Sequence, residues 1–376
     1  PDPEGRYIID PQDSRIMVQL GREEETDQPR YSVVREDRDN DGDGRRGEDS
    51  ERGIDVNRNF PEGWFNDDNE KAGSGFYPSS APESHAILEF FTNHTNILMV
   101  QSFHTSGGFT YRPFARWADS QIHAKDLAVF DRIMGEKYVE LHGEGADASR
   151  LWRHPYNDQQ NRPYGYGIFI DWAYAQFGSY SMTTELWNWQ RDTRGLPGFE
   201  GEEDRSAWYR ALLENGEEVI GQRLFVPWRS YDHPDLGEGE VGGWISKYVG
   251  SNALPGETLR HVAETHWQFE LFKAGLLPKL AITEATAETL ATSGNTRIVK
   301  VTAEVENTGA LATHVARGAD LPGNRDDAIW LLGDRNRVKY LQGNPWRSLG
   351  VLDGTMEIPG YDPSGAPRAR GSGQQQ

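Results

Sequence analysis

The sequence predicts an α/β domain with a mixed, largely parallel sheet, followed by a small antiparallel β-sandwich. Between residues 80 and 275, short apolar runs alternate with segments of helical periodicity, which is typical of a parallel sheet built from βα units. Beyond Pro278 the apolar positions recur with a period of two, as in antiparallel strands that have one solvent-facing side. The first 75 residues are polar and rich in Gly, Asp and Arg, and they predict loops and short strands.

The first helix is predicted to begin within residues 80–83, with Ser80 as the N-cap and Pro82 in the first turn. Apolar side chains at helical spacing in residues 86–91 continue it. The next run, residues 96–103, is short and almost continuously apolar. Such a run indicates a buried parallel strand.

The remaining helices are predicted from apolar residues at helical spacing, and the remaining strands from short apolar runs or from apolar residues at every second position. In the α/β region we expect helices at about 125–141, 204–222 and 257–275, and strands at 167–171 and 180–184. In the C-terminal region we expect strands at 297–305, 328–332 and 337–341. The predicted domains are residues 1–278 for the α/β domain, 279–370 for the β-sandwich and 371–376 for a disordered tail.

Composition excludes several classes of function. The 376 residues carry 39 Lys and Arg against 59 Asp and Glu, a formal net charge of −20, which argues against a nucleic-acid binder. The sequence contains no apolar run of the roughly 18–20 residues that a membrane span needs. It also contains no cysteine, so thiolate metal sites and Cys nucleophiles are ruled out.

Three short motifs carry the chemistry. Asn57-Arg58-Asn59 places a forked cation beside amide groups, which can bind a carboxylate. His104 closes the apolar run 96–103 and Glu185 closes the run 180–184, where sites form in α/β sheets. Burial near aromatic residues would raise the pKa of Glu185 and suit it to general-base work. Singly, each motif has an ordinary alternative: a polar turn, a structural His and a strand-end Glu.

In this order and spacing, with the Ile170-Asp171-Trp172 segment before Glu185, the motifs resemble the zinc metallocarboxypeptidases (the carboxypeptidase A-like family) over about residues 1–278. The resemblance implies an α/β sheet with helices on both faces and hydrolysis of C-terminal peptide bonds. It implies His104 as a zinc ligand and Glu185 as the general base. It also implies that Asn57 and Arg58 bind the terminal carboxylate of a peptide or protein substrate.

The resemblance implies further roles for residues with weaker matches. A family Tyr that closes over the substrate corresponds to Tyr164 or Tyr166, and Ile170 occupies the position that sets side-chain preference. An apolar residue there disfavours basic C-terminal residues. Arg15 is a candidate for stabilising the oxyanion, on chain order alone.

The sequence departs from the family pattern in its zinc ligands. The family H-x-x-E motif lies upstream of the Asn-Arg-Asn segment, but no His precedes Asn57 here. The plain H-x-x-E in this chain, His261 to Glu264 with His266 beyond it, is predicted to lie on a solvated helix flank. Because catalytic zinc needs three protein ligands, and because the chain starts at Pro1, we expect an upstream segment to carry the other two. The alternative is a metal-free relative.

An acidic loop forms a motif independent of the family. Residues 37–48 fit the pattern of an EF-hand calcium loop, with Gly42 at the sharp turn and no helices predicted at its flanks. A second frame starts at Asp39 and ends at Asp49. The candidate calcium ligands are Asp37, Asp39, Asp41, Asp43, Glu48 and Asp49. The alternative is a solvated acidic loop.

The sequence therefore predicts a zinc-dependent carboxypeptidase that requires Zn²⁺ and has a Ca²⁺-type loop. Secretion, or export to the periplasm, is inferred from the family and from that loop. Two other hypotheses stay open. One is a catalytically inactive, peptide-binding relative that keeps the Arg58 pocket. The other is a calcium-dependent binding module based on the acidic loop and the β-sandwich.

Overall fold

The computed structural model describes residues 2–21, 24–33, 54–65, 73–194, 196, 198–199, 204–234, 237–245, 249, 252–322, 326–334, 336–341 and 344–362. The acidic loop with its candidate calcium ligands lies outside these residues. Within them, the strands are β1 (Tyr7–Ile9), β2 (Met17–Gln19), β3 (Met99–Thr105), β4 (Phe109–Tyr111), β5 (Trp152–Arg153), β6 (Tyr180–Leu186), β7 (Phe225–His233), β8 (Gly237–Trp244), β9 (Leu280–Ser293), β10 (Thr296–Asn307), β11 (Asp327–Trp330) and β12 (Trp346–Gly350). The α-helices are α1 (Pro82–Asn93), α2 (Ala124–Ala128), α3 (Glu136–Leu141), α4 (Ala148–Leu151), α5 (Pro155–Asp158), α6 (Phe169–Trp172), α7 (Trp189–Asp192), α8 (Arg205–Ala211), α9 (Glu217–Ile220), α10 (Glu257–Gly275) and α11 (Ala316–Ala319). The 3-10 helices are η1 (Val56–Arg58) and η2 (Asp119–Gln121), and the π-helical segments are η3 (Val129–Gly135), η4 (Ala173–Phe177) and η5 (Leu212–Gly216).

The central element is a four-stranded mixed sheet with the strand order β3-β6-β4-β5. β3 runs parallel to β6, and β4 runs parallel to β5, while β4 and β6 are antiparallel. The predicted mixed, largely parallel sheet is therefore confirmed. Its two longest strands, β3 and β6, are the two that the apolar runs predicted before His104 and Glu185.

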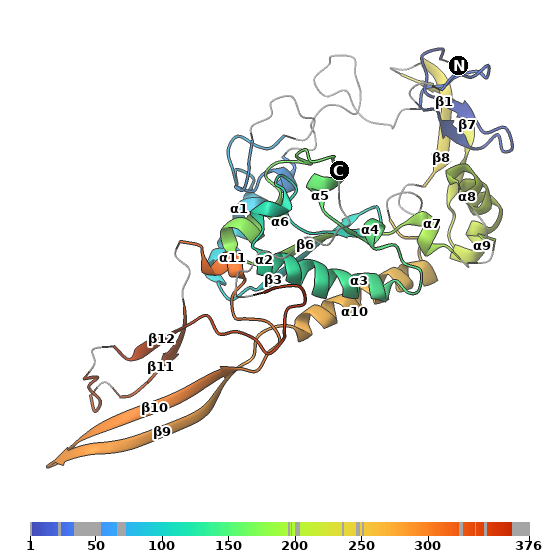
Figure 1. The fold of residues 1–376 in the computed structure, drawn as a ribbon. Coiled ribbons are helices and arrows are strands. Elements are labelled where there is room, and N and C mark those ends of the chain that lie inside the picture. The colour runs from blue at the N-terminus through green and yellow to red at the C-terminus, as the bar shows by residue number, and fades with distance from the viewer. Residues whose placement is uncertain are drawn as a thin grey trace.

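Helices cover both faces of this sheet (Figure 1). On one face, Tyr180 and Met182 of β6 share a buried cluster with Phe130 of η3 and Phe269 of α10. On the other face, Val100 of β3 packs against a cluster that contains residues of α1 and α6. Because neighbouring residues of a strand point to opposite faces, the alternation along β6 leaves Ser181, Thr183 and Glu185 on the face that α6 covers.

The long helices lie where the periodicity predicts them. α2, η3 and α3 follow one another without a break over residues 124–141, and α10 covers residues 257–275. At the start of α1 the prediction needs a correction. Ala81 is the N-cap and provides no side-chain cap, while the Ser80 hydroxyl accepts a hydrogen bond from Asn59 Nδ2 at 3.2 Å.

Two predicted strands are wrong. Residues 169–172, which overlap the expected strand 167–171, form helix α6, because this apolar segment is buried between the sheet and the loop at residues 113–116. Residues 337–341 lie in a turn and coil, and β12 at residues 346–350 is the strand that pairs with β11. Short apolar runs do not distinguish a buried helical turn from a strand.

The C-terminal region contains two antiparallel sheets of two strands each. β9 and β10 form a long hairpin that projects from the body of the molecule (Figure 1). β11 and β12 form a second pair beside it. The chain between the two pairs returns to the α/β domain, where Leu311 and Val315 are buried in the same cluster as Phe130 and Tyr174.

A second lobe contains the N-terminal strands. β1 lies near the β7–β8 hairpin at the end of the molecule that carries the N-terminus (Figure 1). Trp208 of α8 and Leu254 form a separate buried cluster with Val262 of α10, which connects this lobe to the central domain. No helix in the described ranges is long and apolar enough to cross a membrane.

Candidate functional site

The carboxyl ends of β3 and β6 bring two predicted site residues together. His104 and Glu185 are paired in register across these parallel strands, so their side chains lie on the same face of the sheet. On the other side of β6, Phe109 of β4 pairs with Glu185. The three residues therefore form a row across the sheet, with the carboxyl group between an imidazole and an aromatic ring.

A second row lies directly beneath the first. Thr183 of β6 pairs with Tyr111 of β4, which in turn pairs with Arg153 of β5. The Arg153 guanidinium lies 4.3 Å from the ring centroid of Phe109 and 5.4 Å from that of Tyr111. The Arg153 guanidinium therefore lies over the two aromatic rings beside Glu185. The same guanidinium forms an ion pair with Asp158 at 2.8 Å.

After His104 the chain makes a tight turn whose backbone is hydrogen-bonded to the end of β6 at Glu185. The N–H of Gly108 donates to the Glu185 carbonyl at 2.6 Å, and that of Gly107 donates to the Trp187 carbonyl at 2.9 Å. Gly108 has a φ of +73°, and a Cβ atom there would lie 2.6 Å from the Asn188 Cβ. Only glycine fits this position, which explains the small residues that follow His104.

The Asn57-Arg58 segment forms the short helix η1, and Asp55 fixes its start. The Asp55 carboxylate accepts the N–H of Asn57 at 2.9 Å. The Asn57 side-chain oxygen accepts the N–H of Phe169 at 2.9 Å, which attaches η1 to helix α6. Arg58 Nη1 donates to the Asn57 carbonyl at 2.9 Å and lies 4.0 Å from the Asp55 carboxylate.

The second Asn of this motif has a structural role that the sequence did not reveal. Asn59 is fully buried, and its Nδ2 donates to the carbonyl oxygens of Ser74 at 2.6 Å and Tyr77 at 3.0 Å. Its Oδ1 accepts the N–H of Ala81 at 2.9 Å and the hydroxyl of Ser84 at 2.6 Å. Asn59 therefore joins η1 to the start of α1 and holds Arg58 in place.

These segments enclose a cavity of about 180 Å³. It contains six of the predicted site residues: Asn57, Arg58, His104, Tyr164, Ile170 and Glu185. The other lining residues, which the sequence did not reveal, are Asp55, Tyr111, Ala115, Pro155, Ile168 and Thr183. Of these, Thr183 could have been found by extending the period of two back from Glu185 along the predicted strand 180–184.

The remaining two predicted residues do not line the cavity. Tyr166 lies behind it, with its ring 5.1 Å from the Arg116 guanidinium and 5.4 Å from the Phe65 ring centroid. Of the two tyrosine candidates, Tyr164 is thus the one at the cavity. Arg15 lies in the N-terminal lobe, where its guanidinium pairs with Asp13 at 2.6 Å and its carbonyl accepts Trp228 Nε1. The structure therefore places Arg15 away from the cavity, and chain order was a poor guide.

The lining of the cavity contains both charged and apolar side chains. Arg58, His104, Glu185 and Asp55 lie among its polar lining, whereas Ile168, Ile170, Ala115 and Pro155 form an apolar part. Burial raises the pKa of Glu185, and the neighbouring His104 opposes this in part. A carboxylate with a raised pKa is a better proton acceptor and donor near neutral pH than a solvated one.

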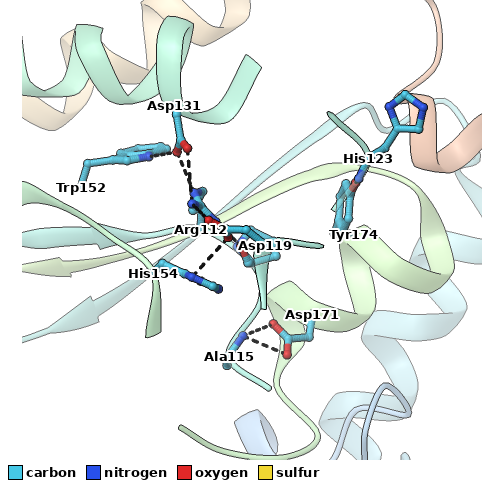
Figure 2. A network of polar contacts seen from close by, with 10 residues as sticks. Arg112, Ala115, Asp119, His123, Asp131, Trp152, His154, Asp171 and Tyr174 are labelled. Carbon is cyan, nitrogen blue, oxygen red and sulfur yellow. Dashed lines mark hydrogen bonds and ion pairs between the residues drawn. The ribbon is translucent and has the colours of Figure 1, made fainter. Parts of the chain in front are cut away.

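A buried polar network supports the outer wall of the cavity (Figure 2). Arg112, which follows Tyr111, is 5% exposed and donates to Asp119 at 2.7 Å and to Asp131 at 2.7 Å. His154 Nδ1 lies 3.2 Å from the same Asp119, and burial lowers the pKa of this imidazole. Since Pro155 follows His154, the network fixes the segments that supply Tyr111 and Pro155.

The described residues do not by themselves fit a catalytic zinc site. Zinc in such sites has three protein ligands, but no group of three His, Asp or Glu side chains within the described ranges could hold a metal ion. Among the described residues that line the cavity, His104 is the imidazole, and it lies with the carboxylates of Asp55 and Glu185. His261 and Glu264 of the H-x-x-E on α10 are exposed, as predicted, whereas His266 is buried and its Nε2 lies 3.1 Å from the Tyr138 hydroxyl.

The sequence of this chain is similar to that of known proteins over part of its length. Residues 25–199 match the family model described as zinc carboxypeptidase. The chain is 29% identical to carboxypeptidase A5 of Homo sapiens over 156 residues, which is 39% of this chain and 32% of that protein. It is 28% identical to carboxypeptidase A1 of Rattus norvegicus over 152 residues, or 39% and 33% of the two chains. The chain therefore spans about a third of the length of these relatives.

Among solved structures, the comparison finds thrombin activatable fibrinolysis inhibitor at 22% identity, with a TM-score of 0.28 and coverage of 36% of this chain and 35% of that chain. The segment matched by the family model contains all six predicted residues that line the cavity. Arg15 and the C-terminal sheets lie outside it.

Proposed function

We propose that the cavity binds the C-terminus of a peptide and serves the hydrolysis of its last peptide bond. The premise is the match of residues 25–199 to the zinc carboxypeptidase family model, which confirms the predicted resemblance. The observation that carries the proposal is the meeting of Arg58, His104 and Glu185 in one cavity. Each comes from a different segment of the chain, so their meeting is a property of the fold.

Recognition of the chain end rests on Arg58 and Asn57. The guanidinium provides N–H donors in a planar fork that matches a carboxylate. Nη1 already donates to the Asn57 carbonyl, which fixes the plane of the fork and lowers the entropic cost of binding. The apolar part of the cavity, with Ile170 at its side, would accept the terminal side chain and favour apolar over basic residues.

Glu185 acts as the proton carrier of the proposed reaction. It accepts a proton from the attacking water and passes it to the leaving amine. Partial burial keeps its pKa above that of a solvated carboxylate, which makes it a stronger base towards the attacking water. Tyr164, half-exposed at the cavity and 5.7 Å between ring centroids from Tyr111, would cover the bound terminal residue.

For zinc, we propose that His104 is one ligand and that the others lie outside the described residues. Zinc, when bound, would supply Lewis-acid chemistry at the scissile carbonyl. A second candidate function, a peptide-binding relative without catalysis, is favoured by one observation: the described residues hold the Arg58 cavity but no three-ligand metal group. Calcium binding by the acidic loop, and secretion, stay predictions.

Two measurements test the proposal and separate these candidates. Calorimetry with N-acetyl-L-phenylalanine and with its amide tests recognition of the carboxylate, and equal affinities would contradict it. Hydrolysis of an N-blocked dipeptide at saturating Zn²⁺ tests catalysis, with Glu185→Gln expected to lower kcat by about 10²–10⁴. Glu144, exposed and outside the cavity, provides the matched control Glu144→Gln. Binding of the carboxylate without any hydrolysis would favour the non-catalytic relative.

A further inference from the structure

The residue after Ile170 is a buried carboxylate that the proposed mechanism does not use. Asp171 is 2% exposed. Its Oδ1 and Oδ2 atoms lie 2.8 and 3.1 Å from the backbone nitrogen of Ala115, and Oδ2 also accepts the N–H of Arg116 at 3.2 Å (Figure 2). These bonds join helix α6 to a loop 55 residues earlier in the sequence. Asp171 therefore connects two segments that no strand pairing connects.

Both segments form walls of the cavity. Ile170, beside Asp171 on α6, and Ala115, whose N–H it accepts, line the cavity and are buried. Together with Tyr111 and Ile168 they form a single buried apolar cluster. The position of the Ala115 wall relative to Ile170 thus depends on the hydrogen bonds of Asp171.

The fold keeps this carboxylate although its burial is unfavourable. Burial raises the pKa of Asp171 to about 7, with the charge of Glu62 acting in the same direction, while the two N–H groups and Arg116 lower it. The Arg116 guanidinium does not pair with Asp171 but donates to the Gly63 carbonyl at 2.7 Å and lies 4.7 Å from the Trp117 ring centroid. A buried charge held mainly by backbone N–H groups fixes those groups in place.

We propose that Asp171 is a positioning residue that holds the Ala115 wall against Ile170 and thereby makes the cavity selective for a bulky, apolar terminal side chain. This inference rests on the proposed function of the cavity. It adds a residue that sets specificity without contacting the substrate. Ile170 provides the apolar surface. Asp171 fixes the distance between Ala115 and Ile170, and the terminal side chain of the substrate must fit between them.

The test compares two ligands that share a carboxylate and differ in side chain. Affinities of N-acetyl-L-phenylalanine and N-acetylglycine are measured by calorimetry for the wild type and for Asp171→Asn. The variant keeps the shape of the side chain but turns an NH₂ group towards one of the two backbone N–H donors. We expect the affinity for the phenylalanine ligand to fall about tenfold or more and that for the glycine ligand to change less than about twofold.

Asp126 provides the matched control. It is also a buried carboxylate that accepts two backbone N–H groups, those of Ala316 and Arg317, but it lies outside the cavity lining. Asp126→Asn should leave the ratio of the two affinities unchanged. Loss of selectivity in both variants would indicate a general loosening of the fold and would overturn the assignment to Asp171.

A second variant covers the case in which Asp171→Asn does not fold. Ala115→Gly removes the methyl group of the wall. It should lower the ratio of the affinity for N-acetyl-L-phenylalanine to that for N-acetylglycine at least about threefold. Two outcomes overturn the inference: an unchanged ratio in a folded Asp171→Asn, or an unchanged ratio in Ala115→Gly. If neither ligand binds the wild type, the proposed function of the cavity fails, which is distinct from failure of the role of Asp171.

Discussion

His104 and Glu185 are direct partners in neighbouring parallel strands, and their backbone pairing fixes the relation between the two side chains. A candidate metal ligand and a candidate base thus share one face at one edge of the sheet. The residues that would bind the substrate approach this edge from η1 and from the segment before α6.

Arg58→Ala should weaken binding of N-acetyl-L-phenylalanine by about 10–100-fold, because a hydrogen bond to a charged group contributes about 1.5–3 kcal/mol. Arg58→Lys should recover part of the loss, since an ammonium group keeps the charge but not the planar fork. Arg132→Ala is the control, as Arg132 is exposed and pairs with Glu136 on the helix over residues 124–141. Equal affinities of the three variants, measured by calorimetry, would contradict the role of Arg58.

Gly167→Ala should destabilise the protein and also weaken ligand binding. Gly167 has a φ of +59°, and an added Cβ would lie 2.3 Å from the Arg58 backbone oxygen. Gly294, at the tip of the β9–β10 hairpin, has a φ of +56° with nothing within 4 Å, so Gly294→Ala isolates the backbone cost of about 1 kcal/mol. Urea unfolding should give a larger loss for Gly167→Ala, and equal losses would show that the close contact with Arg58 relaxes freely.

The free energy of unfolding should depend on pH through Asp171. Burial raises its pKa to about 7 in the folded chain from the 3.8 of a solvated Asp, so the folded state binds more protons between these values. Stability therefore falls as pH rises from about 4 to about 7. The difference between wild type and Asp171→Asn isolates this contribution, of the order of 4 kcal/mol at most. A difference that stays constant over this pH range, in urea titrations, would mean that the carboxyl group is not perturbed.

Asp126→Asn should loosen the C-terminal region without changing the cavity. The Asp126 carboxylate accepts the hydroxyl groups of Tyr174 and Tyr180 and the N–H groups at the start of α11. An amide cannot accept all four bonds, and each unsatisfied buried donor costs about 1–3 kcal/mol. Hydrogen exchange should accelerate at residues 316–317 first. Unchanged exchange there would show that Val315 and Leu311 hold this region by packing alone.

Zinc binding by this chain should depend on His104. His104→Ala should lower the affinity for Zn²⁺ at least about tenfold, because the variant lacks the one imidazole in the cavity. His85, exposed on α1, provides the control His85→Ala. Zn²⁺ affinity is measured by equilibrium dialysis in excess Ca²⁺. The Ca²⁺ occupies carboxylate sites in acidic loops, so that the Zn²⁺ bound at His104 is measured separately. Equal affinities in wild type and His104→Ala would remove His104 from the ligand set.

The sequence was most informative where one physical pattern is strong. Helix α10 was predicted because its helical periodicity extends over 19 residues, and the strands that carry His104 and Glu185 were predicted because each follows a short, apolar run. The short strands β4 and β5, with three and two residues, exist because β6 offers an edge to β4, and β4 in turn offers an edge to β5. No local signal marks such strands, since their pairing is decided by tertiary contacts.

The same limit applies to the site. Residues at the ends of predicted strands or in a distinctive tripeptide were found, whereas Ala115, Pro155 and Ile168 are ordinary residues that line the cavity only through folding. Arg15 was proposed from chain order, which does not constrain distance in space. Ile170 lines the cavity although its segment is a helix and not the predicted strand, and its role in side-chain preference stays a prediction.

The pairing of β3 with β6 also bears on how the site comes into existence. Its partners, such as His104 and Glu185, are 81 residues apart in the chain, so no local hairpin can nucleate the contact, and a long loop must close before any of these bonds form. A partly folded chain would therefore possess helices but no binding site. Ligand affinity should vanish together with the tertiary structure, which makes a bound carboxylate a reporter of the completed fold.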